Sequence, residues 1–77
     1  MEEEEIQLRA FGLRLKELRK QKGITQERLS ELSGMDLSHI ARIETAKRNP
    51  KLTTLIVLSR ALDISLSELV DYPFGSS

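Results

Sequence analysis

The stretch TQERLSELSGMDLSHIARIE, residues 25–44, constrains the fold more than any other part of the chain. Its apolar spacing predicts two short helices separated by Gly34, and Thr25 and Asp36 are good amino-terminal caps for them. Each helix would be shorter than the ~12–15 residues that an isolated helix needs in water. Other helices of the same domain must therefore hold both, and the tight glycine turn lets the two pack only at a steep angle.

The chain has 77 residues and no cysteine, so we expect one domain without disulfides or thiolate metal sites. A domain of this size buries only about 60% of the surface that its unfolded chain exposes, and a partner subunit often supplies the missing stability. The single histidine, His39, has no second ligand at metal-binding spacing. We therefore expect no metal, no cofactor and no small-molecule ligand, and a second copy of the chain as a partner.

The formal net charge is zero, but the charges are unevenly distributed along the chain. Residues 1–8 carry four Glu and no basic residue, whereas residues 9–51 carry eleven Lys and Arg against five acidic residues. Residues 52–77 carry one Arg against three acidic residues. A basic centre between acidic ends favours a nucleic-acid partner, because electrostatic fields act locally. An ordinary scatter of surface charge is the alternative.

No apolar run reaches the ~18 residues that a membrane span requires. The first residues, MEEEE, lack the basic start of a signal peptide. The sequence therefore predicts a cytoplasmic protein with no membrane partner.

The spacing of apolar residues predicts helices along most of the chain and no strand. The first helix is expected over about residues 5–21. A fourth helix is expected to follow Pro50 and to run to about Leu62, and a last one spans about residues 66–71. The fourth helix is apolar nearly all round, which indicates burial on more than one side.

Three helix starts share one pattern. Thr25, Asp36 and Ser65 are amino-terminal caps, each with an apolar residue before it and another four positions after it. Glu68 completes a capping box with Ser65. These helices therefore have well-marked starts, which matters because each is short.

The helix near residues 36–45 has two distinct faces at 100° per residue. Ile40 and Ile43 point inward. The opposite face holds short side chains and one arginine, with two flanking residues: Ser38, Ala41, Arg42 and Thr45, flanked by Leu37 and His39. Such a face can approach the DNA major groove closely, where Arg42 can pair bidentately with guanine and Leu37 can contact a thymine methyl. The two helices thus have the geometry of a helix-turn-helix, whose second helix enters the groove. An ordinary exposed helix face with one arginine is the alternative.

Several spaced elements resemble one known family, in this order: Arg19, Gly23, ITQERLSEL, Gly34, SHIARIE and KRNP. They are similar to the lambda-repressor-like (Cro/repressor or XRE-type) helix-turn-helix family, which includes small phage repressors and restriction–modification controller proteins. The resemblance covers roughly residues 9–70. It implies an all-α fold, a compact bundle of five helices containing the helix-turn-helix, that binds double-stranded DNA as a two-fold homodimer.

This resemblance divides the chain into three parts. We expect a flexible acidic amino-terminal segment at residues 1–8, the helix-turn-helix DNA-binding domain at residues 9–71 and a carboxyl-terminal tail at residues 72–77.

The resemblance also implies roles for individual residues. Gln26 matches a glutamine that commonly grips a phosphate, although its backbone amide at a helix start is an equally good donor. Arg19 and Glu44 match a pair that ties the first helix to the recognition helix, in agreement with their places at the edges of the two apolar faces. The full set of residues expected to contact DNA, for base reading or for backbone contact, is Thr25, Gln26, Leu37, Ser38, Ala41, Arg42, Thr45, Lys47 and Arg48.

Two positions depart from the family pattern. The family usually has Asn-Gly where this chain has Thr45-Ala46, and we expect the alanine to extend the recognition helix by a residue or so. Lys51 stands where a capping serine is common, so we expect Thr53 or a backbone group to cap the fourth helix instead.

A candidate dimer surface consists of apolar residues on the outer side of the fourth helix and beyond it: Ile56, Val57, Leu66, Val70, Tyr72 and Phe74. The alternative is that the fifth helix simply covers the fourth within one chain.

The sequence thus predicts a DNA-binding transcriptional regulator that binds a palindromic operator as a homodimer. A protein-interaction module or an antitoxin with the same fold is the alternative. We expect no enzymatic activity, because the chain has no visible nucleophile–base arrangement and no phosphate-cradling glycine loop.

Overall fold

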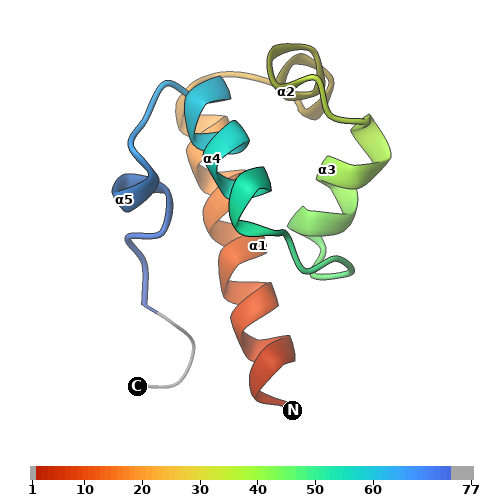
Figure 1. Cartoon of the computed structure of the whole chain (residues 1–77), viewed down its shortest axis with the longest axis vertical. Coiled ribbons are helices and arrows are strands. Elements are labelled where there is room, and N and C mark those ends of the chain that lie inside the picture. Colours follow the sequence, from red (N-terminus) through yellow and green to blue (C-terminus); the bar gives the residue numbers. More distant parts are fainter. Residues whose placement is uncertain (1, 74–77) are drawn as a thin grey trace.

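The computed structural model describes residues 2–73. Within these residues the chain forms five α-helices and no strand, which confirms the predicted all-α class. The helices are α1 (Glu3–Gln21), α2 (Gln26–Ser33), α3 (Leu37–Glu44), α4 (Leu52–Ala61) and α5 (Leu66–Leu69). In Figure 1 the long α1 and α4 lie at the centre, with α2 and α3 on one side and α5 on the other.

One leucine or isoleucine from each helix has no exposed surface. These five residues are Leu15, Leu29, Ile40, Leu58 and Leu69. Burying one such side chain fully contributes about 1.5–3 kcal/mol relative to leaving it exposed. The shared core therefore explains how helices of four to ten residues are stable here although they are too short to form alone.

The α1 helix begins at Glu3, two residues before the predicted start. Three glutamates occupy its first turn, where negative charge interacts favourably with the helix dipole. Side chains one turn apart also interact there, since Gln7 Nε2 donates to Glu3 Oε2 at 2.8 Å. Most of the acidic segment is therefore helical. Its expected flexibility, and the division of the chain at residues 8/9 and 71/72, stay predictions.

Two of the three predicted side-chain caps form. Thr25 Oγ1 accepts a hydrogen bond from the Arg28 amide at 3.0 Å, and Ser65 Oγ accepts one from the Glu68 amide at 3.0 Å. Asp36 occupies the predicted N-cap position of α3 with an extended backbone, but its side chain makes no capping hydrogen bond, so that part of the prediction is wrong. The start of α4 likewise has no side-chain cap at Lys51.

The end of α3 differs from the prediction. The helix stops at Glu44 rather than extending past Thr45, because Ala46 adopts a left-handed backbone with φ of 63°. The Ala46 amide donates to the Ile43 carbonyl, and the Lys47 amide donates to the Arg42 carbonyl at 2.7 Å. These two bonds form a Schellman motif, which usually has glycine at the left-handed position. Alanine thus ends the helix as glycine would, but at a conformational cost.

The last two helices are shorter than predicted: α4 ends at Ala61, with Leu62 as its cap residue, and α5 ends at Leu69.

Candidate nucleic-acid interface

The α3 helix has one buried face and one exposed face. Ile40 and Ile43 are 0% and 1% exposed and anchor the helix in the core. The opposite side is open to solvent, with Ala41 half-buried at its centre. Its exposed residues are Leu37, Ser38, Arg42 and Thr45. The structure therefore brings together on one surface the residues that the sequence predicts to read bases; their role stays a prediction.

A buried ion pair joins α1 to the end of α3. Arg19 Nε donates to Glu44 Oε2 at 2.7 Å, and Arg19 Nη2 donates to Glu44 Oε1 at 3.1 Å. Arg19 Nη1 also donates to the Ile24 carbonyl at 2.9 Å, in the loop before α2. One guanidinium thus links three segments: α1, the loop before α2, and α3.

Gln26 is a third member of this network, which sequence reasoning missed. Its Nε2 donates to Glu44 Oε1 at 2.9 Å, so the side chain is directed to a carboxylate inside the protein. Gln26 is also the first residue of α2, where backbone amides lack intrahelical partners. This bond uses one of the two hydrogens of the side-chain amide, so both phosphate donors that the sequence left open at Gln26, the side chain and the backbone amide, stay predictions.

Gly12 allows α3 to approach α1 closely, and the sequence analysis did not single it out. A Cβ atom at this position would lie 2.7 Å from the carbonyl oxygens of both Ile43 and Glu44. Any larger residue would push α3 away from α1. A glycine in the middle of an amphipathic helix was the available signal, because such a glycine is unfavourable unless close packing requires it.

The arginines of the first two helices are paired with acids, whereas the basic residues that follow Ile40 are not. Exposed pairs in α1 and α2 join Arg9 to Glu5, Arg14 to Glu17 and Arg28 to Glu31. Within residues 2–73, Arg42, Lys47 and Arg48 have no ion pair or side-chain hydrogen bond. All three are exposed. In the same part of the chain, Lys16, Lys20 and Lys22 likewise have no ion pair, so part of the uncompensated positive charge lies on and after α3, next to the predicted reading face.

Thr25 and Thr45 also lie where predicted, at the start of α2 and the end of α3. Both are exposed. The Thr45 hydroxyl donates to the Ala41 carbonyl at 2.9 Å, which leaves its oxygen able to accept but not to donate. The Thr45 amide donates to the same carbonyl at 3.1 Å, so neither donor of Thr45 is directed outward here, and its contact with DNA stays a prediction.

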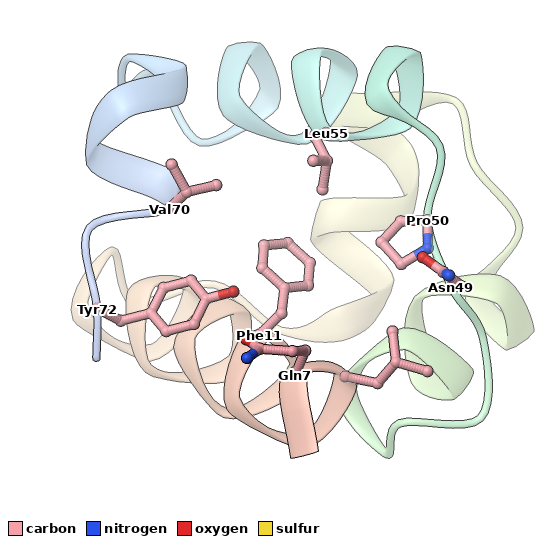
Figure 2. A pocket seen from close by; sticks show the side chains of 8 residues that line it. Gln7, Phe11, Asn49, Pro50, Leu55, Val70 and Tyr72 are labelled. Atoms are coloured by element: carbon pink, nitrogen blue, oxygen red, sulfur yellow. The ribbon is translucent and has the colours of Figure 1, made fainter. Parts of the chain in front are cut away.

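The predicted dimer residues near the carboxyl end partly cover the chain's own core. Leu66, Val70 and Tyr72 are half-buried against it, and the rings of Tyr72 and Phe11 lie 6.2 Å apart. Figure 2 shows Val70, Tyr72, Phe11 and Leu55 around an apolar hollow of about 230 Å³. Burial raises the pKa of the Tyr72 hydroxyl above its ordinary value. These contacts agree with the alternative that the fifth helix covers the fourth within one chain, and a role of these residues in a dimer stays a prediction.

The remaining described residues of the predicted dimer surface, Ile56 and Val57, lie on α4 instead of near the carboxyl end. Val57 is 37% exposed on the outer side of α4, and Ile56 beside it is half-buried. Leu52, which the sequence analysis did not include, is 63% exposed and lies one turn before Ile56. Phe74 lies outside the described residues. A dimer contact through α4 stays a prediction.

Residues 2–73 contain no group of three or more His, Cys, Asp or Glu able to hold a metal ion. None of the helices in this part of the chain is long and apolar enough to span a membrane.

Comparisons with known proteins agree with this geometry. Residues 15–69 match the HTH_3 helix-turn-helix family. The chain is 44% identical over 64 residues to the HTH-type transcriptional regulator PuuR of Escherichia coli. That match covers 83% of this chain and 35% of PuuR, so the chain spans about a third of that relative's length.

Two solved structures of restriction–modification controller proteins are also similar. C.AhdI from Aeromonas hydrophila superposes with a TM-score of 0.78 at 47% identity, covering 80% of this chain and 94% of C.AhdI. C.Esp1396I, solved as a tetramer in complex with its natural 35-base-pair operator, gives a TM-score of 0.72 at 28% identity. This second match covers 83% of this chain and 95% of C.Esp1396I. These relatives are transcriptional regulators and controller proteins rather than enzymes.

Proposed function

The chain belongs to the helix-turn-helix (HTH_3) family of DNA-binding transcriptional regulators, and we propose that it reads a palindromic operator as a homodimer through α3. The observation that carries this proposal is the division of α3 into a fully buried face and an exposed face of mostly short side chains with one unpaired arginine. A helix with this division can lie in the major groove without steric conflict, while its far side stays in the core.

We assign base reading to Leu37, Ser38 and Arg42. Arg42 is the only long donor among the exposed residues of α3, and a guanidinium can bond guanine O6 and N7 together. Leu37, 42% exposed at the start of the helix, can contact a thymine methyl. Ala41 between them keeps the centre of the face shallow, which permits close approach.

We assign contacts with the DNA backbone to residues on both sides of this face. Lys47 and Arg48 supply positive charge after α3, and the amides at the start of α2, at Thr25 and Gln26, supply donors before it. Such contacts fix the position of the protein on the duplex without reading sequence.

A homodimer would place two α3 helices about 34 Å apart, one turn of the duplex, on a two-fold symmetric site. Support comes from the small size of the core and from the exposed apolar residues of α4, Leu52 and Val57. The tetramer of C.Esp1396I on its operator is a precedent for self-association among proteins of this fold.

Selection of binders from random duplex DNA tests the proposal, with purified protein at roughly 0.15 M salt, where exposed charges more than about 8 Å apart are largely screened. A two-fold symmetric consensus is the expected result. Recovery of only weak binding that disappears as salt rises would contradict it, and would favour a protein partner for the same surface.

A further inference from the structure

The α1 helix carries a second apolar stripe on the side that faces away from the core. Leu13 lies in this stripe and is 66% exposed, although it is a leucine in the middle of the helix. It points about 160° away from the fully buried Leu15, because successive residues of an α-helix are about 100° apart. Ile6 and Ala10 lie on the same side as Leu13 and are half-buried. This stripe is therefore not needed for the chain's own core.

Shallow hollows lie on both sides of Leu13. One, of about 280 Å³, is lined by α1 together with Tyr72 and Pro73 near the end of the described chain. The other, of about 190 Å³, is lined by α1 together with the end of α3 and Ala46. An exposed leucine beside a hollow is a shape that a second copy can match, because two-fold symmetry lets each leucine enter a hollow of the other copy.

The charges along this side of α1 are divided between its two ends. Glu2 precedes the acidic first turn, whereas Lys16 and Lys20 lie in the last two turns. All three are exposed and lie within about 60° of Leu13 around the helix axis. Within residues 2–73, none of these three side chains makes an ion pair or a hydrogen bond. One end of the stripe thus has unpaired negative charge and the other end has unpaired positive charge.

This distribution of charge selects both the partner and its orientation. Two α1 helices packed antiparallel, with their Leu13 side chains at the centre, place the acidic start of each beside the basic end of the other. A parallel pair would instead bring like charges together, which electrostatic complementarity disfavours. A second copy of this chain therefore supplies the apolar centre and the opposite charges that the stripe requires.

We propose that the outer side of α1 is a self-association surface on which two copies of this chain pack antiparallel about Leu13. It is separate from the dimer surface proposed on α4, so where that dimer also forms, the two surfaces together link dimers into tetramers. The contact is weak, because its apolar area is small and interfaces that bury less than ~1,200 Å² are typically transient. On DNA a weak contact is sufficient, since two dimers held on neighbouring sites have an effective concentration of about millimolar.

Sedimentation without DNA tests the surface, from tens of micromolar to about 1 mM protein, the range in which weak contacts form. We expect the average mass of the wild type to rise with concentration above its value at tens of micromolar. Leu13→Glu should abolish this rise and leave the mass at tens of micromolar unchanged. Leu32→Glu changes an apolar residue of α2 that is 45% exposed. It is the matched control and should leave the rise intact.

A pair of charge reversals tests the antiparallel orientation. Lys20→Glu puts a carboxylate at the basic end of the stripe, and Glu2→Lys puts a cation at the acidic end, so each variant alone should show a smaller rise in mass. An equal mixture of the two should recover the rise, because each altered end then meets an end of opposite charge. Lys22→Glu and Glu4→Lys make the same charge changes on the far side of the helix. Alone or mixed, these controls should behave like the wild type, although their net charges equal those of the test variants.

Three results would overturn this inference. They are a wild-type mass that stays constant up to about 1 mM, where weak contacts form, a rise that Leu13→Glu leaves unchanged, and a mixture of Lys20→Glu with Glu2→Lys that does not recover the rise. The first result would favour a different protein as the partner of this side of α1. None of these measurements involves an operator, so the selection from random duplex DNA tests the proposed function separately.

Discussion

Arg19 and Glu44 form a two-bond ion pair in the interior, with N–O distances of 2.7 and 3.1 Å, although 25 residues separate them in the sequence. Their side chains are only 9% and 2% exposed. The pair sets the end of the recognition helix against α1, directly beside the close contact at Gly12. The orientation of the reading face therefore depends on residues that never need to touch DNA.

Removing the carboxylate should destabilise the protein more than it changes sequence preference. Glu44→Ala leaves Arg19 buried without its partner and also frees Gln26, and breaking a buried pair in this way costs about 3–5 kcal/mol. Urea unfolding measures the loss. Glu31→Ala removes an exposed partner of Arg28 and should cost less than about 1 kcal/mol. Similar losses in the two variants would show that the buried pair contributes little.

Replacing Ala46 by glycine should stabilise the fold. The left-handed backbone at φ of 63° is unfavourable for alanine and free for glycine, so we expect a gain of about 0.5–1 kcal/mol. Thermal or urea unfolding detects it. Ala10→Gly, in the interior of α1, is the matched control and should lower stability by about 0.5–1 kcal/mol. A loss of stability in both variants would mean that Ala46 is not strained in solution.

Arg42 and Lys47 should respond differently to truncation. Arg42→Ala should weaken operator binding by about 1–3 kcal/mol and relax preference at one base position of each half-site. Lys47→Ala should weaken binding to all sequences alike and flatten the salt dependence by about 0.9. Affinities for the consensus and for single-base variants of it separate the two patterns. An equal loss on every sequence with Arg42→Ala would remove its base-reading role.

A charge on the outer side of α4 should prevent self-association. Val57→Glu places a carboxylate on the surface that we assign to the dimer, where a second chain would have to bury it. Sedimentation at tens of micromolar should show a dimer for the wild type and a monomer for the variant. Leu13→Glu changes an even more exposed apolar residue, on α1, and should leave the dimer intact. The opposite result for the two variants would move the interface to α1.

The raised pKa of Tyr72 should appear in the dependence of stability on pH. Burial favours the neutral phenol, so the unfolded chain loses this proton at lower pH than the folded protein does. The stability that this group contributes is fully present below about pH 10, its unfolded pKa, and decreases as pH rises through the folded value. Tyr72→Phe should remove that component, as seen by urea unfolding from pH 8 to 11. An unchanged alkaline loss in the variant would assign it to other groups.

The sequence predicted the local features of this fold well, because short-range interactions determine them. The caps at Thr25 and Ser65 and the left-handed glycine turn at Gly34 form as expected, since each involves atoms only a few residues apart. The two faces of α3 were also predictable, since helical geometry alone separates Ile40 and Ile43 from Arg42. Asp36 carries the same local pattern, yet its side chain makes no capping hydrogen bond, so the pattern alone does not decide whether a cap forms.

By itself, the sequence determined the all-helical class, the family and the set of side chains that share the exposed face of α3. Only the tertiary structure decided that the Gln26 side chain bonds Glu44 and that Tyr72 packs on Phe11. It also decided that Ala46 takes the conformation usual for glycine. The reason is physical: helix periodicity and capping act over about four residues. The contacts of Gln26 and Tyr72 instead join segments far apart in the sequence, and the Ala46 backbone belongs to the chain reversal after α3.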